Sequence, residues 1–559
     1  MNQILLALLL GIFRMVVIPA EFSDRAFVRE YEEMKADVLQ AQQYFNDQLH
    51  GKDSLLLEFA PIVRLSEKTA YYGANYTDRK DILLHEGVME ACRLSDGETD
   101  FAKTDAVILI AAGMSEADGA GAELIWPQYA RLSDYSKGLK LDGQDLDKFA
   151  VATELSSEEG KDPTPAGIRI LCHEIAHAIG LHDMYDTDGE GSGGLSEGLR
   201  GTSLMGSIEG KGHGLPPNFS ALDLEILGRG DCDTLSIGRH TLSPIHKEQR
   251  YIKMLTDTEG EFFLFECRSD DGWDRDLGGK GLLIYHVDMS ASDAGYSDYY
   301  GRNMSAAERW EKAQINANPA HQCAYIVAAV PESNRSEDIF FPRPGHDSFG
   351  SDTRPAFRFW NGNTSNIAIS EIRLESDGSI SFTASEPIRI SSTAIFQDAA
   401  IIQWETAENF KNILGYEIEW TDGTDTWTDS INASRSSYTI SGLTPQKHYV
   451  FKLTLKASEE NRYSIKDAFI TKYYRNDTYP YIYLSSAERN PDGSFVAGSK
   501  IPLRIFNAPG IHEVKWYFNN KPIEAEADGY YTIRSSGRLK AEISYKDGYS
   551  EVIIKDIRL

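Results

Sequence analysis

The segment Leu171–Glu190, LCHEIAHAIGLHDMYDTDGE, decides the fold and the chemistry that we expect of this chain. It places three histidines and several acids among small and apolar residues. His173 and His177 are four positions apart, so an α-helix puts both imidazoles on one face, within reach of one metal ion. The apolar residues between them predict that the opposite face of this helix is buried.

Glu174 follows the first histidine and completes the arrangement H-E-x-x-H. It lies beside the histidine face, where its carboxylate can take a proton from a metal-bound water without being a ligand. Zn²⁺ lowers the pKa of such a water to about 7. The motif therefore predicts a zinc hydrolase with Glu174 as the general base.

Gly180 is expected to end the helix, because glycine accepts the positive φ of a helix C-terminus. Three residues later comes Asp183, which gives the spacing H-E-x-x-H-x-x-G-x-x-D and predicts the third zinc ligand. His182 is the competing candidate for that ligand. A site with three protein ligands leaves the fourth position to water.

Two further residues are expected to support the chemistry. Met205, in TSLMG, resembles the methionine of the Met-turn in metzincin proteases, which forms an apolar floor beneath the metal. Tyr185 is a second candidate catalytic residue, as a hydrogen-bond donor to the tetrahedral intermediate; its alternative is a packed aromatic beside the site.

Acids alternate with glycines directly after this motif. Asp186, Asp188 and Glu190 offer hard oxygen ligands on a tight loop, which predicts a Ca²⁺ site. The alternative is that they are solvated acids of a turn.

The composition limits the partners. The chain has 559 residues and a formal net charge of −29, which argues against nucleic acid or an anionic membrane as the partner. The five cysteines are widely scattered and include no CxxC pair, so neither a cysteine zinc site nor a disulfide framework is expected.

The N-terminus reads as a weak or truncated signal. Residues 1–13 contain the apolar run ILLALLLGIF without a preceding Lys or Arg, and we interpret them as a signal-peptide remnant. This predicts a secreted, cell-surface or periplasmic protein. The run is too short to span a bilayer, and no transmembrane span is expected elsewhere.

The sequence predicts a multidomain protein. Residues 25–50 read as an amphipathic helix, AVILIAAG (Ala106–Gly113) as a buried strand, and GAELIWPQY (Gly121–Tyr129) as an edge strand along which substrate binds. We therefore expect an α+β zincin- or metzincin-like catalytic domain over residues 14–230. Short alternating segments predict a β-rich region over residues 231–385.

Two all-β sandwich modules are expected at the C-terminus. Residues 386–473 resemble a fibronectin type III module, with Trp404 as the core aromatic and Tyr449 as the corner tyrosine. Residues 474–559 read as an immunoglobulin-like β-sandwich with NN and DG hairpin turns. These modules are expected to bind substrate or a surface.

Between residues 14 and 385 the chain resembles the immune inhibitor A family of secreted bacterial zinc metallopeptidases. The segments that carry the resemblance are VVIPAEFSD, AQQYFNDQLHGK, TAYYG, AVILIAAGMSEADGAGAELIWPQ, LCHEIAHAIGLHDMYDTDGEG, SLMGS, PPNFSALDLEILG, FFLFECRSDDGWDRDLGGKGLLIYHVD and NANPAHQ. The resemblance implies a catalytic domain with a trailing β-rich region, and hydrolysis of peptide bonds in protein or peptide substrates. This chain has Gln128 and His182 where family members often have His and Pro.

Two other functions compete with a zinc endopeptidase. One is a non-catalytic adhesin or binding protein in which the zinc domain is only a scaffold, and an intact Glu174 argues against it. The other is a zinc hydrolase of a different bond, such as a deacylase. The length of the family resemblance argues against that.

Overall fold

The computed structural model describes residues 11–77, 79–135, 138–156, 162–207, 214–408, 410, 413–458, 462–472, 480–484, 487–508, 510–546 and 548–559. Residues 1–10 of the predicted signal segment lie outside this range, whereas Ile12 and Phe13 belong to the first strand. The chain divides into two compact units. The first comprises the described residues up to Ser236 with His240–Pro344 and Ile372–Ser381; the second comprises Ile237–Arg239, Gly345–Glu371 and Phe382–Leu559.

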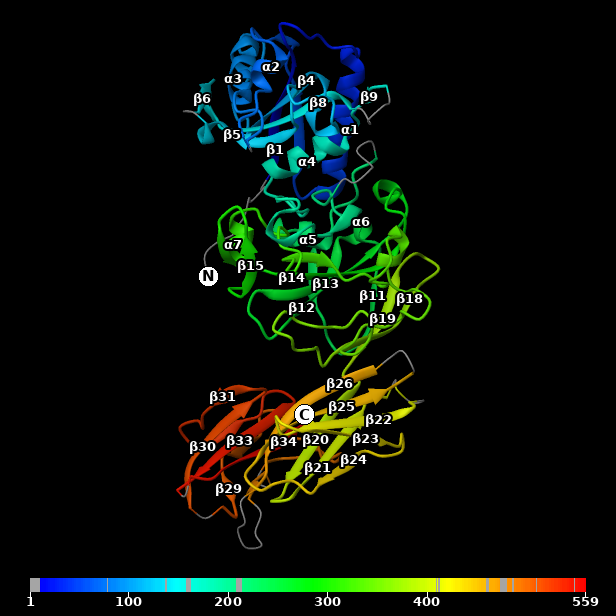
Figure 1. Cartoon of the computed structure of the whole chain (residues 1–559), viewed down its shortest axis with the longest axis vertical. Helices are drawn as coiled ribbons and strands as arrows, with labels where there is room; N and C mark the ends of the chain where they lie inside the picture. The colour runs from blue at the N-terminus through cyan, green and yellow to red at the C-terminus, as the bar shows by residue number, and fades with distance from the viewer. Residues whose placement is uncertain are drawn as a thin grey trace. The chain divides into compact units, whose positions relative to one another are not determined.

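The first unit is built on a mostly parallel sheet (Figure 1). Its strands, in spatial order, are β2 (Ser54–Phe59), β1 (Ile12–Glu21), β4 (Ala106–Met114), β8 (Lys148–Ser156) and β5 (Gln128–Arg131). Neighbours pair in parallel except β5, which is antiparallel to β8 and lies at the edge. Short β3 (Val63–Arg64) pairs with β1, and β9 (Thr164–Pro165) pairs with β8.

Helices cover both faces of this sheet. Alternate residues of β1 belong to two different cores: Met15 and Val17 pack with helices α1 (Tyr31–Leu49) and α4 (Arg169–Ala178), whereas Val16 and Ile18 pack with α3 (Leu84–Ser95) and α2 (Thr69–Tyr72). Strands buried on both faces read as continuous apolar runs, as AVILIAAG does. The expectation of an α+β domain did not specify this layered, mostly parallel arrangement.

Helix α1 follows from its apolar spacing, because its buried residues recur every three or four positions and face the sheet. These residues are Met34, Val38, Ala41, Tyr44, Phe45, Gln48 and Leu49. The predicted edge strand, however, begins only at Gln128. Residues 121–127 form turns and a single bridge from Ser115 to Ile125, consistent with the positive φ of Gly121 and the missing N–H of Pro127.

A second sheet of the first unit has the order β10-β12-β13-β14-β17 (Asp231–Thr234, Arg250–Leu255, Glu261–Arg268, Gly281–Asp288 and Ala324–Ile326). The short helices α5 (Ala221–Ile226), α6 (Ile245–Glu248) and α7 (Ala306–Glu311) accompany it. Strands β15 (Asp293–Ser297) and β16 (Arg302–Ser305) form a hairpin. Leu264 and Tyr285 of this sheet belong to the same hydrophobic core as α1 and α4, so both sheets share one core. Strands β11 (Gly238–Leu242), β19 (Ile380–Ser385) and β18 (Ala368–Leu374) form another sheet in that order.

The second unit contains two sandwich modules. The first pairs β20-β21-β24 (Ile388–Ile395, Ala399–Thr406, Ser437–Ser441) with β23-β22-β25-β26 (Thr426–Ile431, Gly415–Thr421, His448–Lys456, Arg462–Ile470). Trp404 is buried in its core, and the Tyr449 hydroxyl accepts a hydrogen bond from the Thr444 N–H at 3.0 Å. This is the tyrosine corner expected from the sequence.

The last module is also all-β. Its main sheet is β31-β30-β33-β34 (Lys521–Ile523, Ile511–Phe518, Gly537–Tyr545, Ser550–Ile557). The pairs β27-β29 (Tyr481–Ile482, Ile505–Phe506) and β28-β32 (Lys500–Pro502, Tyr530–Thr532) complete it. We retain the division of the chain at residues 230, 385 and 473 as a proposal.

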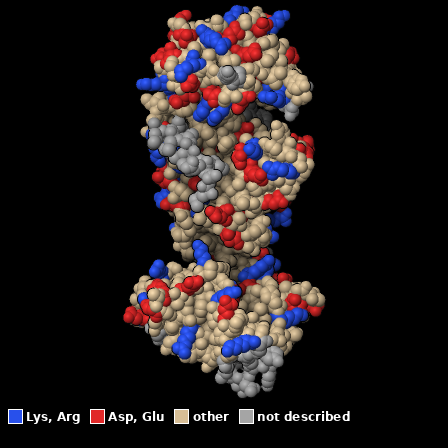
Figure 2. All heavy atoms as spheres, turned by 90° about the vertical axis from the view of Figure 1, so that its left-hand side faces the viewer, with Lys and Arg blue, Asp and Glu red and all other residues tan. Residues whose placement is uncertain are grey.

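The surface is mixed in charge despite the acidic total. On the face shown in Figure 2, acidic and basic side chains are interspersed. No helix among the described residues has the length and hydropathy to cross a membrane. All five cysteines are free, and Cys172 is buried in the core beside the first candidate ligand.

Candidate metal centre

Helix α4 carries both candidate histidines and ends in a defined cap. Gly180 has φ +111°, a conformation that L side chains rarely adopt. The Gly180 N–H donates to the His177 carbonyl at 3.0 Å, and the Leu181 N–H donates to the Ala176 carbonyl at 3.0 Å. This pair of bonds is a Schellman motif. It turns the chain sharply, so that residue 183 returns to the histidine face.

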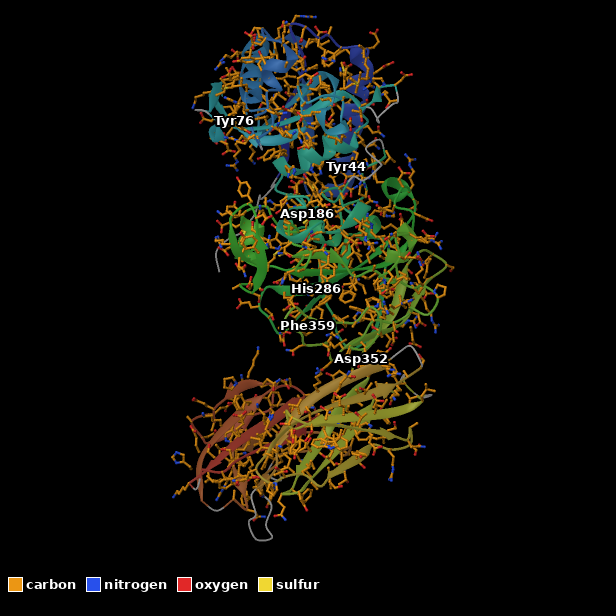
Figure 3. All side chains as sticks on the ribbon, in the orientation of Figure 1. Tyr44, Tyr76, Asp186, His286, Asp352 and Phe359 are labelled. Atoms are coloured by element: carbon orange, nitrogen blue, oxygen red, sulfur yellow. The ribbon has the colours of Figure 1, made fainter. Side chains whose placement is uncertain are left out.

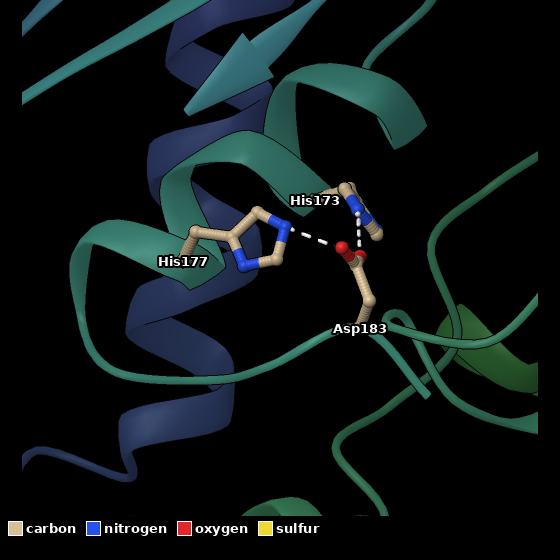
Figure 4. Close-up of side chains that lie close together, drawn as sticks. All are labelled: His173, His177 and Asp183. Carbon is tan, nitrogen blue, oxygen red and sulfur yellow. Dashed lines mark ion pairs between the residues drawn. The ribbon is translucent and has the colours of Figure 1, made fainter. Parts of the chain in front are cut away.

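Three ligand atoms converge there (Figure 4). The Oδ1 atom of Asp183 lies 3.0 Å from His173 Nε2 and 3.2 Å from His177 Nε2. All three ligand atoms lie within 4.8 Å of one another, and among the described residues no other group of three or more His, Cys, Asp or Glu side chains converges in this way. Asp183, not His182, joins the histidine pair.

The other ring nitrogen of each histidine is held by the backbone. His173 Nδ1 lies 3.0 Å from the Leu204 carbonyl, and His177 Nδ1 lies 2.9 Å from the Leu181 carbonyl. A carbonyl only accepts, so each Nδ1 donates to it, and each Nε2 faces the site, where it can bind a metal ion once it carries no proton. Such partners orient metal-binding histidines and raise their basicity.

The electrostatics favour a positive charge between these side chains. Burial lowers the pKa of His173, but the neighbouring Asp183 and Glu174 outweigh this effect and raise the pKa to about 9. Burial raises the pKa of Asp183, yet the two neighbouring histidines hold it well below its usual range. Asp183 Oδ1 is buried without a hydrogen-bond partner of good geometry. A bound divalent cation would satisfy this atom and supply the charge.

Glu174 lies on the same helix and is buried. Burial raises the pKa of its carboxyl, while His173 and His177 lower it. No described residue hydrogen-bonds to its carboxylate, so both oxygens are available to accept a proton.

Tyr185 and His182 flank the third candidate ligand. Burial, together with the charges of Asp183 and Glu174, raises the pKa of Tyr185 far above its ordinary value, so its hydroxyl stays protonated and able to donate. The ring centroids of Tyr185 and His173 are 6.2 Å apart. Burial lowers the pKa of His182, which lines a neighbouring cleft.

The turn at residues 203–206 holds the ligands through its backbone. Its Leu204 carbonyl binds His173, and its Met205 carbonyl accepts the Met184 N–H at 2.8 Å. Ser203 Oγ accepts the Met205 N–H at 3.1 Å, which tightens the turn. Met205 itself is fully buried in the core shared with α4.

The predicted calcium ligands have a different environment. Asp186 (Figure 3) accepts the N–H groups of Ser196 at 2.9 Å and Asp188 at 3.2 Å. Asp188 Oδ2 accepts the Ser192 hydroxyl, whereas its Oδ1 is buried without a partner. Glu190 is exposed. The calcium site stays a prediction.

Two clefts adjoin the centre. One, of about 530 Å³, is lined by Tyr129 and Arg131 of β5 and by His177, His182 and Asp183. The other, of about 630 Å³, is lined by Tyr185, by residues around the 203–206 turn, and by Arg169 at the start of α4. The Tyr129 ring stacks near His177, with centroids 5.8 Å apart. The edge strand β5 therefore borders the centre.

Comparison with known families identifies this region. Residues 93–228 match the family model of the immune inhibitor A peptidase M6 catalytic domain. The match spans β4, β5, β8, α4 and the 203–206 turn, and it supports a metallopeptidase that acts on proteins. Residues 385–466 match the fibronectin type III domain. Both matches confirm the resemblance expected from the sequence.

The remaining comparisons add little to these two matches. The search of curated proteins found no match. One solved structure that matches comes from a computer-based redesign of a β-sandwich protein and is 20% identical in sequence. The match covers 16% of the present chain and 94% of the redesigned chain, with a TM-score of 0.14. A score this low supports no conclusion about the fold.

Sequence reasoning missed a buried charge cluster next to the 203–206 turn. Arg268, fully buried on β13, donates to Asp274 at 2.5 Å, to Glu266 at 3.1 Å and to the Thr202 carbonyl at 3.2 Å. The pairing satisfies the buried guanidinium, and the last bond ties the second sheet to the residue before the turn. The motif RSDDGWD gave no signal that Arg268 and Asp274 would pair.

Proposed function

We propose that this chain is a zinc-dependent endopeptidase, with His173, His177 and Asp183 as zinc ligands and Glu174 as general base. The observation that carries the proposal is the convergence of two imidazole Nε2 atoms and one carboxylate oxygen beside a free carboxylate. Zinc–nitrogen and zinc–oxygen distances of about 2.0–2.2 Å in a tetrahedron separate ligand atoms by roughly 3.3 Å. The observed separations of 3.0 and 3.2 Å fit that geometry.

The residues of this chain would divide the chemistry as follows. Zinc, when bound, supplies a Lewis acid that polarises the scissile carbonyl and promotes deprotonation of water. Glu174 accepts the proton of the attacking water and delivers it to the leaving amine. The Tyr185 hydroxyl, kept protonated by its surroundings, donates a hydrogen bond to the developing oxyanion.

Substrate would bind in an extended conformation along the outer edge of β5. Among the described residues, β5 pairs with β8 along one side only, which leaves its other side as the edge where a peptide could pair. We further propose export to the cell surface or beyond, and a calcium ion at Asp186, Asp188 and Glu190. The C-terminal sandwiches would attach the protein to substrate or to a surface.

Casein or gelatin cleavage by the purified full chain tests the proposal, with and without chelator and beside Glu174→Ala. We expect cleavage that the chelator abolishes, that added zinc restores, and that the variant lacks. Zinc bound at the three ligands without cleavage of any protein would instead favour a binding protein with a zinc scaffold.

A further inference from the structure

Met184 directly follows the third candidate ligand, and both of its backbone polar groups are hydrogen-bonded. The N–H of Met184 donates to the Met205 carbonyl at 2.8 Å. The carbonyl of Met184 accepts the side-chain amide of Asn316 at 2.8 Å. Both bonds act one residue after Asp183, so they limit where its carboxylate can lie.

Asn316 comes from a distant part of the chain, 132 residues from Met184. Its side chain is fully buried. The Nδ2 atom also donates to the Ala324 carbonyl at 2.7 Å, and the Oδ1 atom accepts the Ala324 N–H at 3.0 Å. Two carbonyls on one end and an N–H on the other fix which end is the amide nitrogen. The carboxamide is thus locked to β17 and presents one N–H to Met184.

A glycine packs beside the Met184 carbonyl and its donor, where a larger residue would not fit. Gly198 lies against it with φ +52°, and a Cβ there would stand 2.3 Å from the carbonyl oxygen and 3.0 Å from Asn316 Nδ2. The Gly198 N–H is itself held by the Gln322 side chain at 2.6 Å. The segment around Asn316 therefore encloses the ligand-bearing loop.

We propose that Asn316 is a positioning residue that preorganises Asp183 for metal binding. Asn316 would touch neither metal nor substrate. It acts by holding the Met184 carbonyl, while the Met184 N–H is held by the 203–206 turn. The inference rests on the proposed zinc site. Protein contacts would then fix the conformation of the ligand-bearing loop before the metal binds. Some of these contacts come from residues 314–326, which lie beyond the matched peptidase segment.

The chain offers a matched control two residues away. Asn318 is also buried, donates to the Tyr296 carbonyl at 3.0 Å and accepts the Ala320 N–H at 2.9 Å. It makes no hydrogen bond to residues 181–186 in the described part of the chain. Asn316→Ala removes a buried carboxamide that bonds three backbone groups, and Asn318→Ala removes one that bonds two, so both are expected to lower thermal stability.

Zinc affinity, measured by chelator competition on the stripped full chain, separates the two roles. We expect Asn316→Ala to weaken zinc binding by about 10- to 100-fold, as loss of an outer-shell partner does, and Asn318→Ala to leave it unchanged. Equal affinities in both variants and the wild type, or equal losses in both variants, would overturn the inference. Asn316→Ser, which keeps a small hydrogen-bonding side chain, replaces Asn316→Ala if that variant does not fold.

Hydrogen exchange on the wild-type protein gives a test that needs no variant. We expect the Met184 N–H to remain protected after zinc is stripped, because the Met205 carbonyl accepts it and Asn316 holds the carbonyl of the same residue, and neither bond involves the metal. Exchange at the rate of an open loop in the stripped protein would overturn the inference. If the wild type binds no zinc at these ligands, the proposed function fails instead. The exchange measurement would still test whether protein contacts alone hold Met184 in place.

Discussion

The segment from His173 to Asp183 and the segment from Asp186 to Glu190 are neighbours, and each contains three predicted metal ligands. In the first, a capped helix and a tight turn bring the ligand atoms within 4.8 Å and leave Asp183 Oδ1 without a well-formed hydrogen bond. In the second, Asp186 and Asp188 already accept hydrogen bonds from nearby N–H and hydroxyl groups. Each segment also has one buried carboxylate oxygen without a hydrogen-bond partner, on Asp183 and on Asp188. The difference teaches that convergence of the ligand atoms, rather than residue type, marks the first segment as the candidate metal centre.

Loss of the Glu174 carboxylate should have the largest effect. Glu174→Gln should lower kcat/KM for a fluorogenic peptide by about 10²- to 10⁴-fold, the range of general acid–base catalysis, with zinc content unchanged. The matched control is Glu190→Gln, the same chemical change in the second segment, which should keep wild-type activity. Equal loss of activity in both variants, or full activity in Glu174→Gln, would contradict the role of Glu174 as general base.

Tyr185→Phe should have the next largest effect. Removing one donor to the developing oxyanion should lower kcat by about 10²-fold, with KM and zinc affinity unchanged. Steady-state kinetics and chelator competition on the same preparation measure these quantities. An unchanged kcat would leave Tyr185 as a packed aromatic only.

Calcium binding at the second segment, Asp186–Glu190, should raise the thermal stability of the protein. At calcium concentrations 100-fold above Kd, binding should stabilise the fold by about 2.7 kcal/mol and raise Tm in a thermal scan. The buried, unpartnered Asp188 Oδ1 is the atom that would gain a partner. Asp188→Asn should abolish the rise, and a wild-type Tm that is independent of calcium would show that these acids only solvate a turn.

His182→Gln should have the smallest effect. Because the carboxylate of Asp183, and not the ring of His182, converges with the two histidines, this substitution should leave zinc affinity unchanged in chelator competition. A large loss of affinity would make His182 a ligand and require the 181–185 loop to rearrange.

Much of the site could be predicted because its signals are local. The four-residue spacing of His173 and His177 follows from helix geometry, and Gly180 follows from the φ that a helix cap requires. The tyrosine corner of the fibronectin module is similarly local, since Tyr449 binds the backbone five residues upstream.

The supporting contacts could not be predicted, because they join distant segments or use backbone groups. The Leu204 and Leu181 carbonyls that orient the histidines have no side-chain signature. Asn316 lies 132 residues from the peptide that it holds. The edge strand was misplaced because apolar GAELIW looked extended, whereas Gly121 and Pro127 favour turns up to Gln128.

Zinc titration of the chelator-stripped full chain tests the central claim most directly, with Asp183→Ala compared against Asp188→Ala. The account predicts one tightly bound zinc in the wild type and in Asp188→Ala. For Asp183→Ala it predicts a loss of affinity beyond the roughly 100-fold typical of an outer-shell partner. Equal zinc affinity in all three proteins, or no zinc bound by the wild type, would contradict it.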